Sequence, residues 1–416
     1  MISDFKNILK NKYFVFLWLS QMLSQITIQS MNFLLLTLLF AKTRSSIATS
    51  LLWVAYTLPA ILIGPFASAV VDMVSKKKAL MFANILQALV IIVYALIYKV
   101  SIFFVFGAVF VYSLLNQFYV PAESSSVPTL VPAKNLPQAN SLFFLTQQAS
   151  TIIGFGVAGI IAQTFGFHVS LFIFAALLIL AFISTSFLPK IEAKESIPEE
   201  FEQAIIAFFK RILEGYRYIK SKKSIIAPYI VLLTMNAAVA VLVVNIPRIA
   251  SEILHVDYTS SGVMVMVPAA TGAIIGSLFI NKLIRKGWRK KKMIEFFLTI
   301  IGIAFLLLTT LVPYLNQLPK IILGMFSSLL IGMAGIGIVI PTQTFLQEVT
   351  PEDMRARVFG NFWFLSTVVT VLPVIFSGTV AELFGIRILL FLMSMIGIGG
   401  LFMSQRYGHK FLVNGK

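Results

Sequence analysis

The chain has 416 residues, of which 58% are hydrophobic and 12% are charged, and its mean hydropathy is +0.93. Soluble domains carry about a quarter charged residues, so this composition excludes a soluble fold and indicates a protein whose solvent is lipid. The net charge of +17 falls in short basic runs between apolar stretches, which favours membrane topology over nucleic-acid binding, and the absence of cysteine excludes disulfides and thiolate chemistry.

Twelve apolar stretches follow one another along the chain, each near the roughly 20 residues that a membrane-spanning helix needs. In chain order, the expected spans are 13–40, 47–71, 79–98, 101–122, 139–164, 168–188, 225–250, 259–281, 293–313, 320–343, 356–381 and 384–404. A longer polar segment separates the sixth span from the seventh. We therefore predict an all-α membrane protein with an N-terminal six-helix bundle over 1–188, a cytoplasmic linker over 189–224 and a C-terminal six-helix bundle over 225–416.

The basic residues also orient the chain. If the N-terminus lies inside and the spans alternate, 27 of the 33 Lys and Arg residues fall on the inner side and six on the outer side. Cytoplasmic loops of membrane proteins are enriched in these residues. The sequence therefore predicts a multi-pass protein of the cell membrane with both termini in the cytoplasm.

The linker has a helical pattern of its own. From Ser196 onward, a proline and two glutamates give good helix-start chemistry. Apolar residues then recur at helical spacing from Phe201 to Ile219, with charged residues between them. This amphipathic helix either lies along the inner membrane surface or packs on the cytoplasmic ends of the bundle, and the sequence leaves both placements open.

Two internal repeats indicate that the halves are duplicated. Segment 58–77 aligns without a gap on 267–286, and segment 119–136 aligns on 339–355. The first pair joins the second and eighth spans, and the second pair joins the fourth and tenth. We therefore expect two six-helix bundles related by pseudo-two-fold symmetry, with the substrate path between them, as is common in transporters.

The stretch "GPFASAVVDMVSKKKAL" (64–80) carries a small-residue helix end, one aspartate and three lysines. It resembles the loop motif between the second and third spans of the major facilitator superfamily, although Ser68 stands where a glycine is frequent. Segments 120–159, 214–225 and 342–360 are similar to the branch of that superfamily that contains macrolide-efflux and enterobactin-exporter proteins. The resemblance covers almost the whole chain and implies two bundles that rock about a central site, open to one side at a time.

The resemblance also implies a gate. Asp72 would latch the two bundles in the outward-open state through a basic partner or a helix N-terminus of the other half. The alternatives are a solvated carboxylate and, for the lysines, a plain topology signal. The repeat places Asn281 where the first half has Asp72, so an ionic latch would be asymmetric. The gating candidates are Gly64, Ser68, Asp72, Lys76, Lys77, Lys78, Asn281 and Arg285.

Polar residues inside the spans mark a candidate substrate path. Four amides share one face of the first span, and a polar stripe in lipid has to face protein or water. Such a stripe either lines the transport cavity or holds helices together by hydrogen bonds. The path candidates are Gln21, Gln25, Gln29 and Asn32 in that span, and Tyr112, Asn116, Gln147, Asn236 and Asn361 elsewhere. Amides, hydroxyls and aromatic rings suit a large amphipathic substrate better than a small ion.

The acidic residues give little support for proton coupling. None of the 16 Asp and Glu residues falls in the middle of a predicted span. Glu123, near the inner end of the fourth span, shares a face with Asn116 and is the best candidate, although it is equally explained as an ordinary boundary charge. Proton antiport is therefore implied by the resemblance and not by a buried acid, and uncoupled movement stays open.

We expect an integral-membrane secondary transporter, not an enzyme, that works by alternating access and exports an amphipathic small molecule of the drug, macrolide or siderophore type. The alternatives are an uncoupled facilitator, a lysolipid transporter and a non-transporting sensor with a transporter fold. There is no phosphate-binding loop motif and the three histidines are scattered, so we expect no cofactor and no metal. The expected partners are the small-molecule substrate, the lipid bilayer and protons, with no nucleic acid, and the chain is expected to be a monomer.

Overall fold

The computed structural model describes the backbone of residues 8–191 and 201–411, and within these ranges every regular element is a helix. Ten of the described helices are long and apolar enough to cross a membrane. Each of the twelve expected spans coincides with a helix or with part of one. The predicted all-α membrane fold is therefore confirmed.

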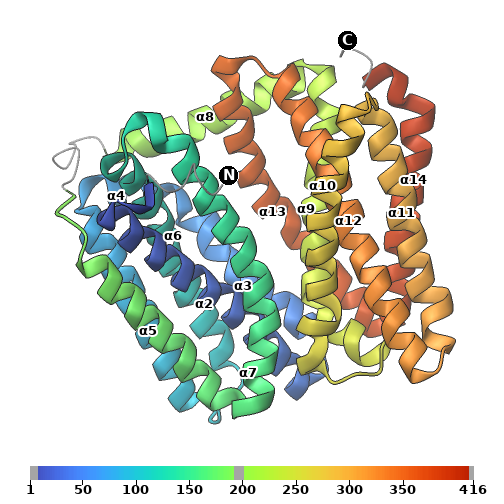
Figure 1. Ribbon diagram of the computed structural model, residues 1–416, viewed down its shortest axis with the longest axis horizontal. Coiled ribbons are helices and arrows are strands. Elements are labelled where there is room, and N and C mark those ends of the chain that lie inside the picture. The colour runs from blue at the N-terminus through green and yellow to red at the C-terminus, as the bar shows by residue number, and fades with distance from the viewer. Residues whose placement is uncertain (1–7, 192–200, 412–416) are drawn as a thin grey trace. The chain divides into compact units, whose positions relative to one another are not determined.

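In the described part of the N-terminal half, the long helices follow one another from α2 to α7 (Figure 1). They are α2 (Lys12–Thr43), α3 (Ser46–Leu62), α4 (Gly64–Met73), α5 (Lys76–Ile97), α6 (Phe104–Leu130) and α7 (Leu136–Ser186). The span expected over 47–71 is divided into α3 and α4, with a proline in the first turn of α4. Helix α7 holds two expected spans, and Gly166 breaks it with φ 79° and ψ 162°, a backbone conformation open to glycine because it has no Cβ.

The second half of the chain begins with the linker helix. The helices are α8 (Phe201–Ser221), α9 (Lys223–Glu252), α10 (Val267–Arg285), α11 (Lys290–Leu306), α12 (Gln317–Val349), α13 (Glu352–Phe384) and α14 (Ile386–Phe411). A π turn over Gly262–Met266 leads into α10, and another over Leu307–Leu311 continues α11.

The described helices form two compact units. The N-terminal unit comprises Met1–Leu39 and Leu52–Phe208, and the C-terminal unit comprises Phe40–Leu51 and Phe209–Lys416. The segment Phe40–Leu51 joins α2 to α3, and below it is called the α2–α3 segment. It packs within the C-terminal unit, although the bodies of both helices belong to the N-terminal unit.

The same helix pairs pack in each unit. In the N-terminal unit α4 contacts α6, and α5 contacts both α6 and α7. In the C-terminal unit α10 contacts α12, and α11 contacts both α12 and α14. Helices α4 and α10 come from one aligned repeat pair, and α6 and α12 come from the other. This recurrence is the pattern that duplicated halves produce.

Glycines allow α10 and α12 to cross in backbone contact. A Cβ on Gly272 of α10 would overlap the carbonyl oxygen of Leu329, and a Cβ on Gly332 of α12 would overlap that of Ala269. Small residues drive such close packing in membranes, where lipid removes the hydrophobic force between helices. Gly335, on the same helix α12, has nothing within 4 Å of its added Cβ and takes no part in the crossing.

The linker helix packs on the C-terminal unit over its described side chains. Ile219 is buried in an apolar cluster with Tyr229 and Val358. A Cβ on Gly215 would lie 2.8 Å from the carbonyl oxygen of Arg357, so α8 and α13 approach closely there. Of the two placements that the sequence leaves open, packing on the helix bundle therefore describes this part of α8. The side chains of residues 201–209 lie outside the described part of the chain.

We predict that Gly332→Ala lowers the melting temperature of the purified protein in detergent by several degrees. The new methyl group meets the backbone of α10, and overpacking of this kind costs typically about 1–3 kcal/mol. Gly335→Ala is the matched control on the same helix and should leave the melting temperature unchanged. Equal melting temperatures for the two variants would contradict the close crossing of α10 and α12.

Candidate functional site

One face of α6 carries a stripe of polar side chains at helical spacing. Its members are Tyr112, Asn116, Tyr119 and Glu123. Tyr119 is fully buried, and the exposed fractions of Tyr112 and Glu123 are 5% and 7%. A polar stripe on a membrane-spanning helix is costly against lipid, so its burial means that this face points into the N-terminal unit.

Hydrogen bonds tie the stripe to α2 and α5. The Tyr119 hydroxyl lies 3.0 Å from Ser20 Oγ, and the amide nitrogen of Asn84 donates to the same Ser20 oxygen over 3.1 Å. All three side chains are fully buried. Around them packs an apolar cluster that includes Phe14 and Leu80. Three helices therefore share one polar junction within an apolar core.

Glu123 lies one helical turn beyond this junction. It follows Tyr119 by four residues on α6, so the two side chains are neighbours on one face of the helix. Its Oε1 atom is buried and has no hydrogen-bond partner among the described residues. The sequence placed Glu123 at the end of a span over 101–122, but α6 continues to Leu130. At a rise of about 1.5 Å per residue, Glu123 is about 10 Å inside the helix end.

Further polar atoms near this face also lack partners among the described residues. They include the Tyr112 hydroxyl, Asn116 Oδ1, Gln21 Oε1 and Asn84 Oδ1. Leaving a buried polar group unsatisfied costs about 1–3 kcal/mol, and native cores carry few such groups. Their concentration on α2, α5 and α6 therefore identifies this part of the N-terminal unit as the candidate site.

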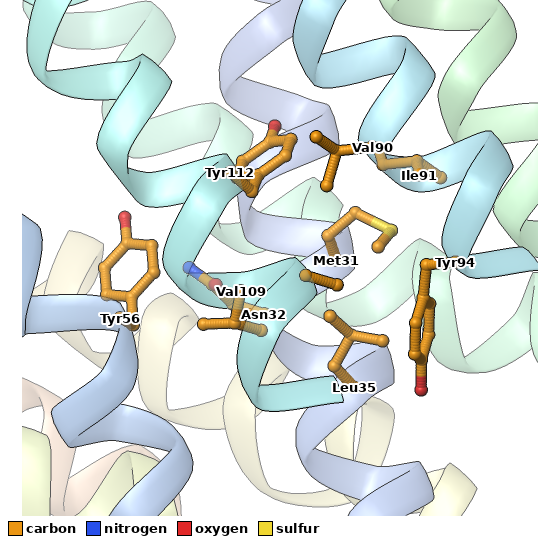
Figure 2. Close-up of a pocket in the computed structure, with 10 residues that line it drawn as sticks. Met31, Asn32, Leu35, Tyr56, Val90, Ile91, Tyr94, Val109 and Tyr112 are labelled. Carbon is orange, nitrogen blue, oxygen red and sulfur yellow. The ribbon is translucent and has the colours of Figure 1, made fainter. Parts of the chain in front are cut away.

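A narrow pocket opens further along the same helices (Figure 2). Asn32 of α2, Tyr56 of α3 and Tyr112 of α6 contribute its polar groups, and Tyr56 also interacts with the Asn32 side chain. Apolar side chains such as Met31 and Val109 form most of the remaining wall. The pocket has room for about one water molecule. In this conformation it is therefore too small for an amphipathic substrate.

The amide stripe of α2 divides between two environments. Gln21 is buried and its Nε2 donates to the Phe143 carbonyl of α7 over 3.0 Å. An added Cβ on Gly154 of α7 would lie 2.5 Å from the Cβ of Gln29, so α2 and α7 are in close contact there. Gln25 is buried as well, whereas Asn32 lines the pocket. Gln21 thus joins α2 to α7 by a hydrogen bond, and Gln29 lies where the two helices pack closely.

The remaining path candidates have different surroundings. Gln147 is exposed on α7, and the half-buried Asn236 donates to the Leu232 carbonyl of its own helix. Asn361 is buried, accepts from the Tyr229 hydroxyl over 2.7 Å and donates to the Ile212 carbonyl of α8 over 2.8 Å. Asn361 therefore ties three helices of the C-terminal unit together. Asn116 and Tyr112 share the α6 face of Glu123, whereas Asn236 and Asn361 belong to the C-terminal unit.

The first-half loop engages two of its three lysines within the N-terminal unit. Lys77 Nζ donates to the Leu188 carbonyl over 2.6 Å, and Lys76 is buried with its Nζ 3.5 Å from the Ser125 carbonyl oxygen. Lys78 is exposed. An added Cβ on Gly64 would lie 3.6 Å from the side-chain oxygen of Gln117 on α6. The side chains of the other four gating candidates lie outside the described part of the chain: Ser68, Asp72, Asn281 and Arg285.

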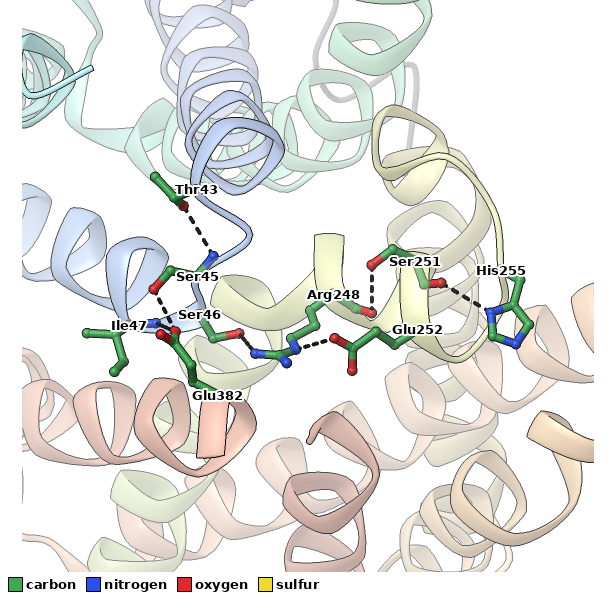
Figure 3. Close-up of polar contacts among 9 residues, drawn as sticks. All are labelled: Thr43, Ser45, Ser46, Ile47, Arg248, Ser251, Glu252, His255 and Glu382. Atoms are coloured by element: carbon green, nitrogen blue, oxygen red, sulfur yellow. Dashed lines mark hydrogen bonds and ion pairs between the residues drawn. The ribbon is translucent and has the colours of Figure 1, made fainter. Parts of the chain in front are cut away.

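A second polar cluster holds the α2–α3 segment within the C-terminal unit (Figure 3). Glu382 Oε2 of α13 accepts from the Ser45 hydroxyl over 2.6 Å and from the Ile47 backbone N–H over 3.1 Å. Arg248 of α9 donates to the Ser46 hydroxyl over 3.0 Å and pairs with Glu252 over 2.7 Å. Below, the contacts of Glu382 and Arg248 with the α2–α3 segment are called the Glu382 cluster.

Sequence reasoning missed several residues of these two clusters. The sequence could have indicated Tyr119 as a member of the polar face, because it lies at helical spacing between Asn116 and Glu123. Asn84 is an amide inside an expected span and could have been singled out on the same ground. Glu382 gave no local signal, because its partner Ser45 is 337 positions away. Among the described residues, no three His, Asp or Glu side chains are placed to hold a metal ion.

Known proteins match most of the chain. The Major Facilitator Superfamily pattern matches residues 17–373. The uncharacterised MFS-type transporter YfiS of Bacillus subtilis (strain 168) is 25% identical over 357 residues, covering 84% of this chain and 82% of YfiS. The multidrug efflux pump Tap of Mycolicibacterium fortuitum is 24% identical over 362 residues, covering 82% of this chain and 83% of Tap.

Solved structures of similar fold are also transporters. The nucleoside transporter NupG aligns with a TM-score of 0.72 and 14% identity, covering 97% of this chain and 100% of NupG. A POT family transporter in complex with a thioalcohol-conjugated peptide aligns with a TM-score of 0.72 and 12% identity, covering 96% of both chains. At these identities the likeness shows the fold alone. With the superfamily pattern over most of its length, the chain belongs to the Major Facilitator Superfamily and is a secondary transporter rather than an enzyme.

Proposed function

We propose that this secondary transporter exports an amphipathic small molecule of the drug, macrolide or siderophore type in exchange for protons, with Glu123 as the proton-carrying group. The observation that carries the proposal is the buried carboxyl of Glu123, which has one oxygen without a partner among the described residues. The similarity to the multidrug efflux pump Tap supports the direction and the class of substrate.

Glu123 has the surroundings that a coupling residue needs. A titratable group at membrane depth is costly, and in transporters such groups mark proton relays. The Tyr119 hydroxyl is its polar neighbour and is itself connected to Ser20 and Asn84. A movement of α2 or α5 against α6 would change this junction, and with it the environment of the carboxyl group. Substrate movement and proton movement would in this way be linked through one residue.

The polar and aromatic groups of the same unit suit an amphipathic ligand. Tyr112 and Asn116 lie on the face of Glu123 and would offer ring surface next to hydrogen-bonding atoms in a state that opens this buried face. Gln147 and Gln148 are exposed on α7, and amides in a membrane-spanning helix require protein, water or a polar ligand beside them. We therefore place the substrate route along this face of α6 and the first half of α7.

Alternating access requires that the two halves separate in one state. We propose that residues 1–188 and 225–416 are the moving halves and that the Glu382 cluster is one of the contacts that breaks. The α2–α3 segment continues into helices of the N-terminal unit but is bonded to α9 and α13. Movement of α2 and α3 with their own unit would pull on these bonds. Asp72 and its loop would act as the second gate, as the resemblance implies.

Transport by the purified protein tests the proposal most directly. The full chain is reconstituted alone in proteoliposomes, and labelled macrolides, siderophores, dyes and lysolipids are offered with and without a pH gradient. Gradient-driven accumulation of an amphipathic compound is the expected result. Accumulation that ignores the gradient would instead favour an uncoupled facilitator, and no movement of any compound would favour a sensor.

We predict that Glu123→Gln abolishes the stimulation of transport by a pH gradient while substrate exchange without a gradient continues. The amide keeps the size of the carboxyl group but cannot carry a proton. Glu295→Gln serves as a control, because Glu295 pairs with Lys291 in the other unit. Gradient stimulation that survives in Glu123→Gln would overturn the role of this residue.

We further predict that Glu382→Ala opens the α2–α3 segment. The chain has no cysteine, so Thr49→Cys introduces a single reporter at a buried position of the segment. In that background, loss of the carboxylate leaves the Ser45 hydroxyl and the Ile47 N–H without their acceptor, and labelling by a membrane-impermeant maleimide should become several-fold faster. Leu383→Ala changes an exposed neighbouring side chain and should not alter the rate. If both variants label as the parent does, the Glu382 cluster is not a gate.

A further inference from the structure

The loop between α10 and α11 concentrates positive charge at one end of the C-terminal unit. Seven Lys and Arg residues lie between Lys282 and Lys292. Lys290 pairs with Glu348, and Lys291 lies 3.6 Å from Glu295. Four of the others are exposed: Lys282, Lys286, Arg289 and Lys292. None of these four forms an ion pair with a described residue, so their charge is exposed at the surface of the C-terminal unit.

The corresponding loop of the first half uses its charge differently. In the aligned repeat, Lys76 is buried and Lys77 donates to the Leu188 carbonyl at the end of α7. Two of the three lysines of that run therefore serve contacts within their own unit. The α10–α11 loop also uses two cations internally, in the pairs Lys290–Glu348 and Lys291–Glu295, but it leaves four further cations exposed, whereas Lys78 alone is exposed in the first-half run of three.

Trp288 stands at the border between this charge and an apolar surface. Its side chain is 41% exposed, and its ring meets the Phe296 ring edge-on at 6.1 Å. On α10, Leu278 and Ile284 are 66% and 49% exposed, as expected for side chains that contact lipid tails. Tryptophan is enriched where a membrane meets water, because its ring is apolar and its N–H is polar.

We propose that the α10–α11 loop binds the headgroup of an anionic phospholipid, with Lys286, Arg289 and Lys292 around the phosphate and Trp288 beside the glycerol region. Basic clusters directly next to a membrane-spanning helix attract anionic lipids. The exposed apolar residues of α10 place the acyl chains next to the same loop, which a free phosphate or a nucleic acid would not use. The loop combines these cations with an interfacial tryptophan, which the Lys76–Lys78 run lacks.

Quenching of Trp288 fluorescence by brominated lipids tests this proposal in the full chain. Trp18→Phe, Trp53→Phe and Trp363→Phe leave Trp288 as the sole tryptophan, and the protein is reconstituted in vesicles containing brominated phosphatidylglycerol or brominated phosphatidylcholine. We expect a preference of about tenfold for phosphatidylglycerol near Trp288. The triple variant Lys286→Gln, Arg289→Gln and Lys292→Gln should lose this preference.

A matched variant separates a local site from general attraction. Lys210→Gln, Arg217→Gln and Lys220→Gln remove the same charge from exposed positions on α8 and should keep the preference at Trp288. Equal quenching by both lipids in the parent would overturn the proposal. So would an equal loss in the two triple variants, or displacement of the lipid by soluble glycerol phosphate.

If the sole-tryptophan chain does not fold, the native chain supplies the same answer. Native mass spectrometry after partial delipidation counts the phosphatidylglycerol molecules that stay bound. The parent and the α8 variant should retain more than the α10–α11 loop variant, and equal counts in all three would contradict the proposal. Neither readout depends on transport, so this inference stands or falls separately from the proposed function.

Discussion

Lipid offers no hydrogen bonds, and this constraint arranges the polar chemistry of the protein. Many polar side chains on the spans turn inward and bond to neighbouring helices, as Ser20 and Tyr119 do in one unit and Asn361 does in the other. Buried oxygens without a partner among the described residues are concentrated on α2, α5 and α6, and they include those of Gln21, Asn84, Asn116 and Glu123. The candidate site is the region in which buried polar groups have only part of their hydrogen-bond partners within the described protein.

The same constraint explains how the helices hold together. Without a hydrophobic force between helices in lipid, close backbone contact and interhelical hydrogen bonds carry the packing. Gly332 brings α12 against α10, and Gly154 brings α7 against α2. Duplicated halves repeat the helix pairs, but they do not repeat the chemistry of the loops. In the first-half run Lys78 alone is exposed, whereas the α10–α11 loop keeps four exposed cations in addition to Lys290 and Lys291, which pair with Glu348 and Glu295.

The sequence was sufficient for the fold because hydropathy and positive charge act locally. The twelve apolar stretches could be read one at a time, and the structure has a helix at each of them. The ends of helices were harder to predict: α6 continues to Leu130, eight residues past its expected end, and small or polar residues of this extension such as Ser126 are buried. That extension moved Glu123 from a boundary into the helix, which no local pattern predicted.

Contacts between residues far apart in the chain could not be predicted from local sequence patterns. Glu382 and Ser45 are far apart in the chain, and nothing near either residue indicates the other. The polar stripe of α2 was recognised from the sequence. Which of its amides contact another helix and which line a pocket was not, because that depends on tertiary packing. Gln21 bonds to α7 while Asn32 lines the pocket, although both lie on one face of one helix.

Proton release on substrate binding tests the central claim about Glu123 most directly. The purified protein, in weakly buffered detergent solution, is mixed with a compound that it transports while the pH is recorded. If Glu123 exchanges its proton for the substrate, the parent releases protons on binding and Glu123→Gln binds the compound without release. Release of the same size from both proteins, or no release from the parent, would contradict the account.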